Sequence, residues 1–102
     1  MPLRYLHFEA SEDADGVLTL EAMAATPAAQ HAAVLAEVQQ VLHWAWQQFP
    51  HSHGPLDDGM DWQHDLQVAL EGGHWHAVTL TLAASPRFAE AFWAAFPADT
   101  VG

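Results

Sequence analysis

The stretch Thr26–Pro50, TPAAQHAAVLAEVQQVLHWAWQQFP, decides the fold because it is the longest segment with a helical repeat of apolar residues. Thr26 is a good helix-capping type, Pro27 suits a first helical position, and Pro50 is the next helix breaker. The spacing predicts one helix between the prolines, about 33 Å long. Its apolar stripe contains Val34, Leu35, Val38, Val41, Leu42, Ala45 and Phe49.

Two alternating stretches precede this helix. Residues 3–10 alternate with Leu6 and Phe8 on one face, and residues 17–25 alternate through Leu18 and Leu20. The Asp15-Gly16 pair between them is typical of a turn. The pattern predicts a hairpin that sets Phe8 opposite Leu20.

The second half of the chain repeats this order. A loop over residues 51–59 leads to alternating stretches at 61–71 and 74–84, joined at Gly72-Gly73. A three-residue connection, 71–73, would set Leu66 opposite Val78 and keep both on the inward face. Ser85-Pro86 then predicts a capped helix to about residue 96, followed by a frayed tail over 97–102.

These elements predict an α+β fold in a single domain, 1–102. The expected architecture is a two-layer ββαββα sandwich, in which two helices cover one face of a four-stranded, mostly antiparallel sheet. A right-handed crossover and a central VTLTL strand favour the strand order 1-2-4-3. In connectivity alone, this order resembles a circularly permuted ferredoxin-like fold.

The charge balance argues against two classes of partner. The chain has 13 acidic residues, two arginines and no lysine, with a formal net charge of -11. Proteins that bind nucleic acid or anionic membranes neutralise phosphates with basic side chains, so we expect neither partner here. There is no cysteine and no apolar run long enough to span a bilayer. We therefore expect a soluble, cytoplasmic protein.

One segment carries several metal-ligating residue types. Within HSHGPLDDGMDWQHD, imidazoles and carboxylates lie close in sequence, and such ligands suit Zn, Ni or Cu. The candidate metal ligands are His51, His53, Asp57, Asp58, Asp61 and His64. The alternative is a solvated acidic loop without a cofactor, because the spacing matches no established zinc motif.

A second histidine grouping depends on how the long helix packs. If the helix runs antiparallel to the preceding strand, its first turn places His31 near His74 and His76. Three imidazoles could form a metal triad. The alternative, which we favour, is a structural role for His31 in the core.

The sheet face that the helices leave uncovered is the candidate binding surface. It presents aromatic and methionine side chains, which are enriched at protein interfaces. The candidate binding residues are Tyr5, His7, Met23 and Trp75, together with Trp44 on the outer side of the long helix. Trp44 either packs under the loop against Leu56 and Met60 or contacts another chain.

The sequence favours a noncatalytic module that binds another protein or self-associates, with a protein partner or a homo-oligomer as its complex. It has no thiol, no G-x-S-x-G elbow, no HExxH helix and no glycine-rich phosphate loop. A metal-binding protein that uses the loop 51–65 is the alternative. A small hydrolase or isomerase at the same loop is a further alternative.

Overall fold

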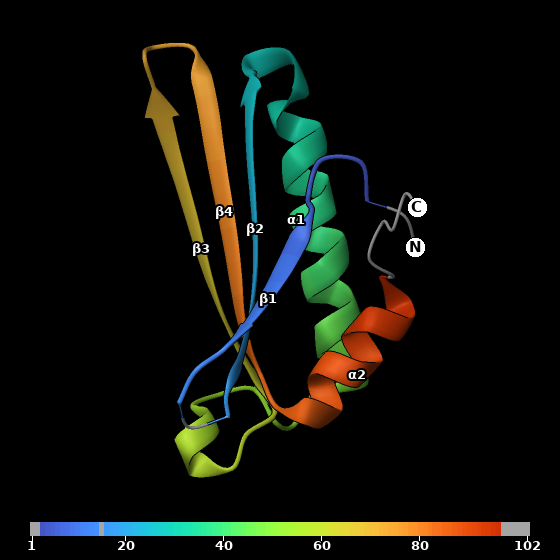
Figure 1. Cartoon of the computed structure of the whole chain (residues 1–102). Helices are drawn as coiled ribbons and strands as arrows, with labels where there is room; N and C mark the ends of the chain where they lie inside the picture. The colour runs from blue at the N-terminus through green and yellow to red at the C-terminus, as the bar shows by residue number, and fades with distance from the viewer. Residues whose placement is uncertain (1–2, 15, 97–102) are drawn as a thin grey trace, which may run out of the picture.

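The computed structural model describes residues 3–14 and 16–96, and in them it confirms the predicted α+β fold (Figure 1). Asp15 and the predicted tail 97–102 lie outside the described residues. In chain order the elements are β1 (Phe8–Glu12), β2 (Leu18–Pro27), α1 (Ala28–Gln48), the short 3-10 helix η1 (Leu56–Asp58), β3 (Trp62–Glu71), β4 (Trp75–Ala84) and α2 (Pro86–Ala95).

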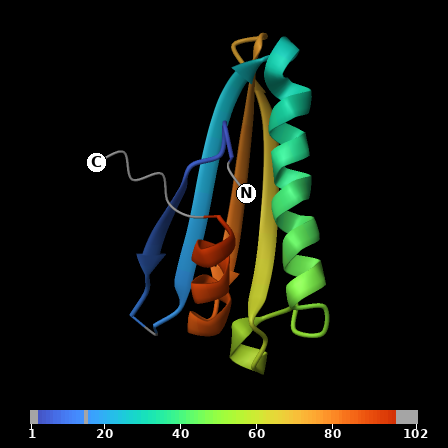
Figure 2. The same ribbon diagram turned by 90° about the vertical axis from the view of Figure 1, so that its right-hand side faces the viewer.

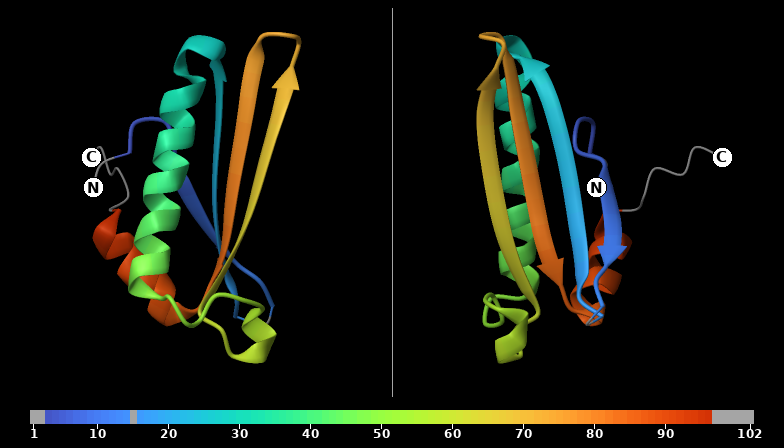
Figure 3. Two further views of the ribbon diagram at one scale, coloured as in Figure 1. Left: turned by 180° about the vertical axis from the view of Figure 1, so that it is seen from behind. Right: turned by 60° about the vertical axis from the view of Figure 1, so that its left-hand side comes forward.

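The four strands form an antiparallel sheet in the predicted order, β1-β2-β4-β3. The strands β1 and β3 are therefore its two edges. Both helices lie on the same face of the sheet, and the other face is open (Figures 2 and 3). Neither α1 nor α2 has the length and apolar character needed to cross a membrane.

The register of the first hairpin differs from the expected one by two residues. Phe8 lies opposite Ala22, and Leu20 lies opposite Ala10. The connection is longer than a tight turn, since the backbone amide of Asp13 donates to the carbonyl of Val17 at 3.0 Å. An even shift preserves the faces, so the predicted inward residues still point toward the helices.

The β3–β4 turn has the predicted length but lies one residue further along. It consists of Gly72, Gly73 and His74, and it sets Leu66 opposite Leu80. Both glycines have positive φ, at 60° and 78°, a conformation that favours glycine over other residues. The inward face of each strand again agrees with the alternation.

The strand β1 begins five residues later than expected because the preceding segment is held by α1. The carboxylate of the buried Glu37 accepts hydrogen bonds from the backbone amides of Arg4 at 2.8 Å, Tyr5 at 3.0 Å and Leu6 at 3.1 Å. The amides of Arg4, Tyr5 and Leu6 point at one carboxylate and are therefore not available to a sheet ladder.

The two helices begin differently, although a hydroxyl residue followed by a proline stands at the start of each. Ser85 caps α2 as predicted, because its Oγ accepts a hydrogen bond from the amide of Phe88 at 3.1 Å. The capping position of α1 is Pro27, and no side chain caps it. Thr26 instead lies within β2, one residue before its end, so the prediction that it caps the long helix is wrong.

The core lies between the sheet and the helices. Its fully buried side chains of largest volume are Trp62, Phe88, Phe92, Leu20, Leu80, Leu82, Val34, Val38, Val41 and Val78. The helix α1 packs on β2 and β4. Toward its turn, the β3–β4 hairpin leans away from α1 (Figure 1). The far half of β3 is consequently left uncovered.

Candidate functional site

Trp44, a predicted binding residue, lies between the two helices. Its half-buried ring meets the rings of Phe88, Phe92 and Phe96 edge-on, with centroids 5.6, 6.0 and 5.5 Å away. Edge-to-face contacts of this kind stabilise aromatic clusters. Packing against α2 therefore accounts for Trp44, which the sequence had placed against the loop or another chain.

The predicted metal loop brings two of its six candidates into contact. Nε2 of His53 lies 2.9 Å from Nδ1 of His64, a hydrogen bond in which one ring donates and the other accepts. The ring of His53 also lies 4.6 Å from that of Trp46 and 4.4 Å from that of Trp62. Across the described chain, no three His, Asp or Glu side chains are grouped closely enough to hold a metal ion.

Three of the remaining candidate metal ligands lie on the surface of the loop. His51, Asp57 and Asp58 are exposed, and the two aspartates belong to η1.

The pKa of His53 is lowered, first by burial and second by the nearby charge of His64. The pair is therefore biased toward a neutral His53. Metal binding at this loop stays a prediction.

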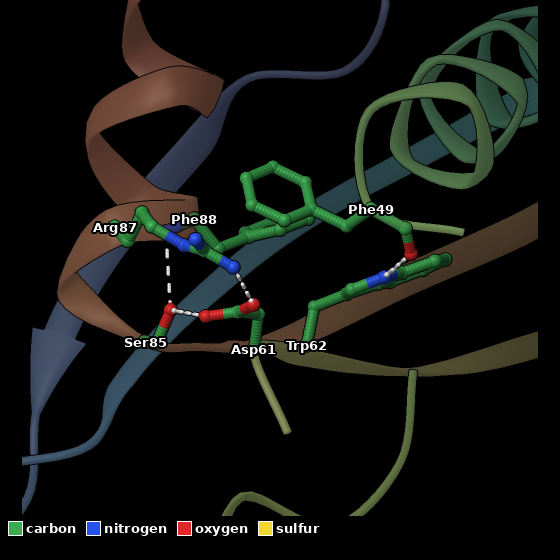
Figure 4. Close-up of polar contacts among 6 residues, drawn as sticks. All are labelled: Phe49, Asp61, Trp62, Ser85, Arg87 and Phe88. Carbon is green, nitrogen blue, oxygen red and sulfur yellow. Dashed lines mark hydrogen bonds and ion pairs between the residues drawn. The ribbon is translucent and has the colours of Figure 1, made fainter. Parts of the chain in front are cut away.

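Asp61 connects the start of β3 to the start of α2 (Figure 4). Its Oδ1 accepts a hydrogen bond from Ser85 Oγ at 2.8 Å, and its Oδ2 pairs with Arg87. The hydrogen bond from Arg87 is the main cause that lowers the pKa of Asp61; burial opposes it, and hydrogen bonds from Ser85 and Ser52 add to it. Both carboxylate oxygens therefore have structural partners.

Next to Asp61, Trp62 fixes the loop to the end of α1. Its indole Nε1 donates to the carbonyl of Phe49 at 3.0 Å, and its ring is fully buried (Figure 4). The loop also pairs with the outer edge of β3, since His53 forms a parallel bridge with Trp62. The segment 52–62 is thus tied to α1, α2 and β3 together.

The second histidine grouping forms in part at the other end of α1. His31 stacks on His76 with ring centroids 4.5 Å apart, as the predicted helix direction requires. His74 is exposed in the turn and lies beside Trp75. Three buried atoms near this stack have no hydrogen-bond partner among the described residues: Thr26 Oγ1, Gln30 Oε1 and His31 Nδ1. No pattern in the sequence pointed to Gln30.

The open face of the sheet carries two of the predicted binding residues. Met23 is 64% exposed and Trp75 is 44% exposed. The other two lie before β1, where Tyr5 is half-buried against the core and His7 is exposed. The predicted surface therefore consists mainly of β2 and β4.

The apolar side chains on the helix-side face of β3 were expected to be buried, but three of them are exposed. On the helix-side face of β3, Leu66 is 37% exposed, Val68 50% and Leu70 59%. Met23 on β2 and Trp75 on β4 are exposed on the opposite face of the same three neighbouring strands. We call all of these residues together the hairpin surface: Met23, Leu66, Val68, Leu70 and Trp75. The alternation gave the direction of these side chains, but it could not show that α1 fails to cover them.

The comparisons with known proteins add no relative: no protein-family model, no curated protein and no solved structure matches this chain.

Proposed function

We propose that this chain is a noncatalytic protein-binding module that binds through the hairpin surface. The observation that supports it most strongly is the distribution of exposed apolar side chains. Of the six large apolar residues exposed in the described chain, five belong to the hairpin surface, and the sixth is Trp46. Scattered apolar residues are ordinary, whereas three exposed apolar residues in a row on one face of an edge strand, as Leu66, Val68 and Leu70 are, are typical of an interaction site.

The chemistry of the hairpin surface also favours protein binding. It combines tryptophan, methionine and branched aliphatic side chains, while the chain as a whole has a formal net charge of -11. Its nearest charged neighbours on β3 are Asp65 and Glu71. Aromatic, methionine and aliphatic side chains of this kind are enriched at the centres of interfaces, where charged residues are depleted.

Site-specific photo-cross-linking tests this proposal. Benzoylphenylalanine placed at Leu70 or at Trp75 should give covalent adducts with another protein chain upon irradiation in cells. The matched control places the same group at Glu90, which is exposed on α2. Adducts at neither hairpin position, or equal adduct yields at Glu90, would contradict the proposal.

Metal binding is a second candidate, supported by the 2.9 Å approach of His53 Nε2 to His64 Nδ1. Two imidazoles at this separation could rotate to share one Zn, Ni or Cu ion, with water completing its coordination. Calorimetric titration of the untagged protein should then show one site that His64→Ala removes. His51→Ala is the control, and equal binding in both variants would reject the pair as the ligand set.

A further inference from the structure

Resting on the proposed function, we propose that the partner is a second copy of this chain. The two copies join by antiparallel pairing of their β3 strands, about a two-fold axis at Gln67. The result is one continuous sheet of eight strands. The two stripes formed by Leu66, Val68 and Leu70 meet across the new strand pair.

The two edges of the sheet differ in how they resist such pairing. The strand β1 has five residues, FEASE, two of them glutamates. The strand β3 has ten residues, WQHDLQVALE, with no proline, glycine or lysine, and its register against β4 runs without a bulge. Edge strands are normally protected by short length, charge, proline or bulges. The strand β1 is short and two of its five residues are charged, whereas β3 is twice as long and has only two acids, Asp65 and Glu71, in its ten residues.

The free part of the β3 edge has defined limits. At its start, the carbonyl of Trp62 accepts a hydrogen bond from the amide of Gly54 at 2.8 Å, so the loop occupies this position. From Gln63 to Glu71 no described strand pairs with the outer edge. The midpoint of this free edge is Gln67. A two-fold axis there pairs Gln63 with the partner's Glu71 and uses the whole free edge.

The neighbouring registers are worse. In an antiparallel pair, opposite side chains share a face, so the axis must pass through a residue position. An axis at Leu66 would set Leu70 against Trp62, where the loop already lies. An axis at Val68 would set Asp65 against the partner's Glu71, and like charges directly opposite destabilise a strand pair.

The register at Gln67 avoids both conflicts. It sets Leu66 opposite the partner's Val68 and Asp65 opposite the partner's Ala69. No acid therefore faces an acid across the pair, even though each copy has a formal net charge of -11. The apolar stripe also offers no carboxylate to a basic partner. This charge pattern favours a second copy as the occupant of the edge.

Disulfide trapping tests the register, because the chain contains no cysteine and each introduced thiol is alone. Opposite residues of an antiparallel pair have Cα atoms about 4.5–5.5 Å apart, within the range that a disulfide spans. Gln67→Cys should form a covalent dimer on mild oxidation at least about tenfold faster than Glu90→Cys, which reports random collisions. Asp65→Cys should cross-link with Ala69→Cys when the two are mixed, and faster than either alone.

Several results would overturn the inference. These are faster cross-linking through Leu66→Cys or Val68→Cys than through Gln67→Cys, or a rate for Gln67→Cys no greater than for Glu90→Cys. Circular dichroism of each variant verifies its fold. If the photo-adducts at Leu70 contain a different protein and Gln67→Cys does not dimerise, the inference fails and the proposed function stands. If no photo-adducts form, both fail.

Discussion

The carboxylate of Glu37 accepts a hydrogen bond from the backbone amide of Leu6 at 3.1 Å, and the same carboxylate holds the amides of Arg4 and Tyr5. Glu37 is only 9% exposed. A buried carboxylate is costly unless its oxygens are satisfied, and here consecutive amides satisfy them. One side chain of α1 therefore fixes the path of the chain before β1.

Replacing Glu37 with Gln should lower the free energy of unfolding by about 1–3 kcal/mol, because an amide NH₂ would face backbone donors. Urea denaturation measures the change. Glu90→Gln, at an exposed position, serves as the control and should stay within about 0.5 kcal/mol of wild type. Equal effects of the two substitutions would show that the Glu37 contacts contribute nothing to stability.

Ser85 and Thr26 should respond oppositely to loss of their hydroxyl groups. Ser85→Ala removes the α2 cap and a partner of Asp61, at a cost of about 1 kcal/mol or more. Thr26→Val removes a buried hydroxyl that has no partner in the described chain, so it should be neutral or stabilising. Thermal unfolding of both variants checks this. Destabilisation by Thr26→Val to the same extent would contradict the structural difference between the two helix starts.

Trp44 and Trp75 should differ in their access to solvent. Trp44 is half-buried among the phenylalanines of α2, whereas Trp75 is 44% exposed. In variants that keep one tryptophan each, acrylamide should quench the fluorescence of Trp75 more strongly than that of Trp44. Stronger quenching of Trp44 would mean that α2 does not pack on α1 as described.

Stability should fall as the pH drops below about 6.5, partly because of His53. Burial and the charge of His64 lower the pKa of folded His53 below its usual 6.5, so the unfolded chain binds the proton more tightly. This contribution is fully present above about pH 6.5 and is lost as the pH falls toward the lowered pKa.

Urea denaturation at about pH 7.5 and about pH 5.5 measures the His53 contribution. The loss of stability between the two pH values should be larger for wild type than for His53→Gln, which cannot titrate there. The pKa of Asp61 is lowered from 3.8, so its own contribution is lost only at more acidic pH. An equal loss in both proteins would exclude His53 as a cause.

The alternation of apolar residues predicted the four strands and their faces, and the handedness of the crossover with the central VTLTL strand predicted the strand order. It did not predict the registers, because Phe8 can pair with Leu20 or with Ala22 without any change of face. Loop length decides between these pairings, and the turn residues alone left that length open. For the same reason, the alternation did not predict that Leu66 pairs with Leu80 and not with Val78: both pairings keep Leu66 on the same face.

The candidate sites were harder to predict because they depend on contacts between distant segments. The sequence placed Asp61 in a metal loop, but Arg87 and Ser85, more than twenty residues later, hold it. Similarly, Trp44 lies on the outer side of the long helix, and its contact with Phe92 of α2 is not visible in the sequence of that helix alone. The apolar residues of β3 looked buried, and only the divergence of the hairpin from α1 exposes them.

Sedimentation velocity of the untagged protein tests the central claim, the pairing of two β3 edges, most directly. Wild type should sediment as a dimer. Val68→Asp, at a half-exposed edge position, should weaken the dimer on the order of tenfold or more, because it places a charge against the partner's Leu66. Ala10→Asp adds the same charge to the other edge, at an exposed position of β1, and should remain dimeric. A monomeric wild type, or a Val68→Asp variant as dimeric as wild type, would contradict the account.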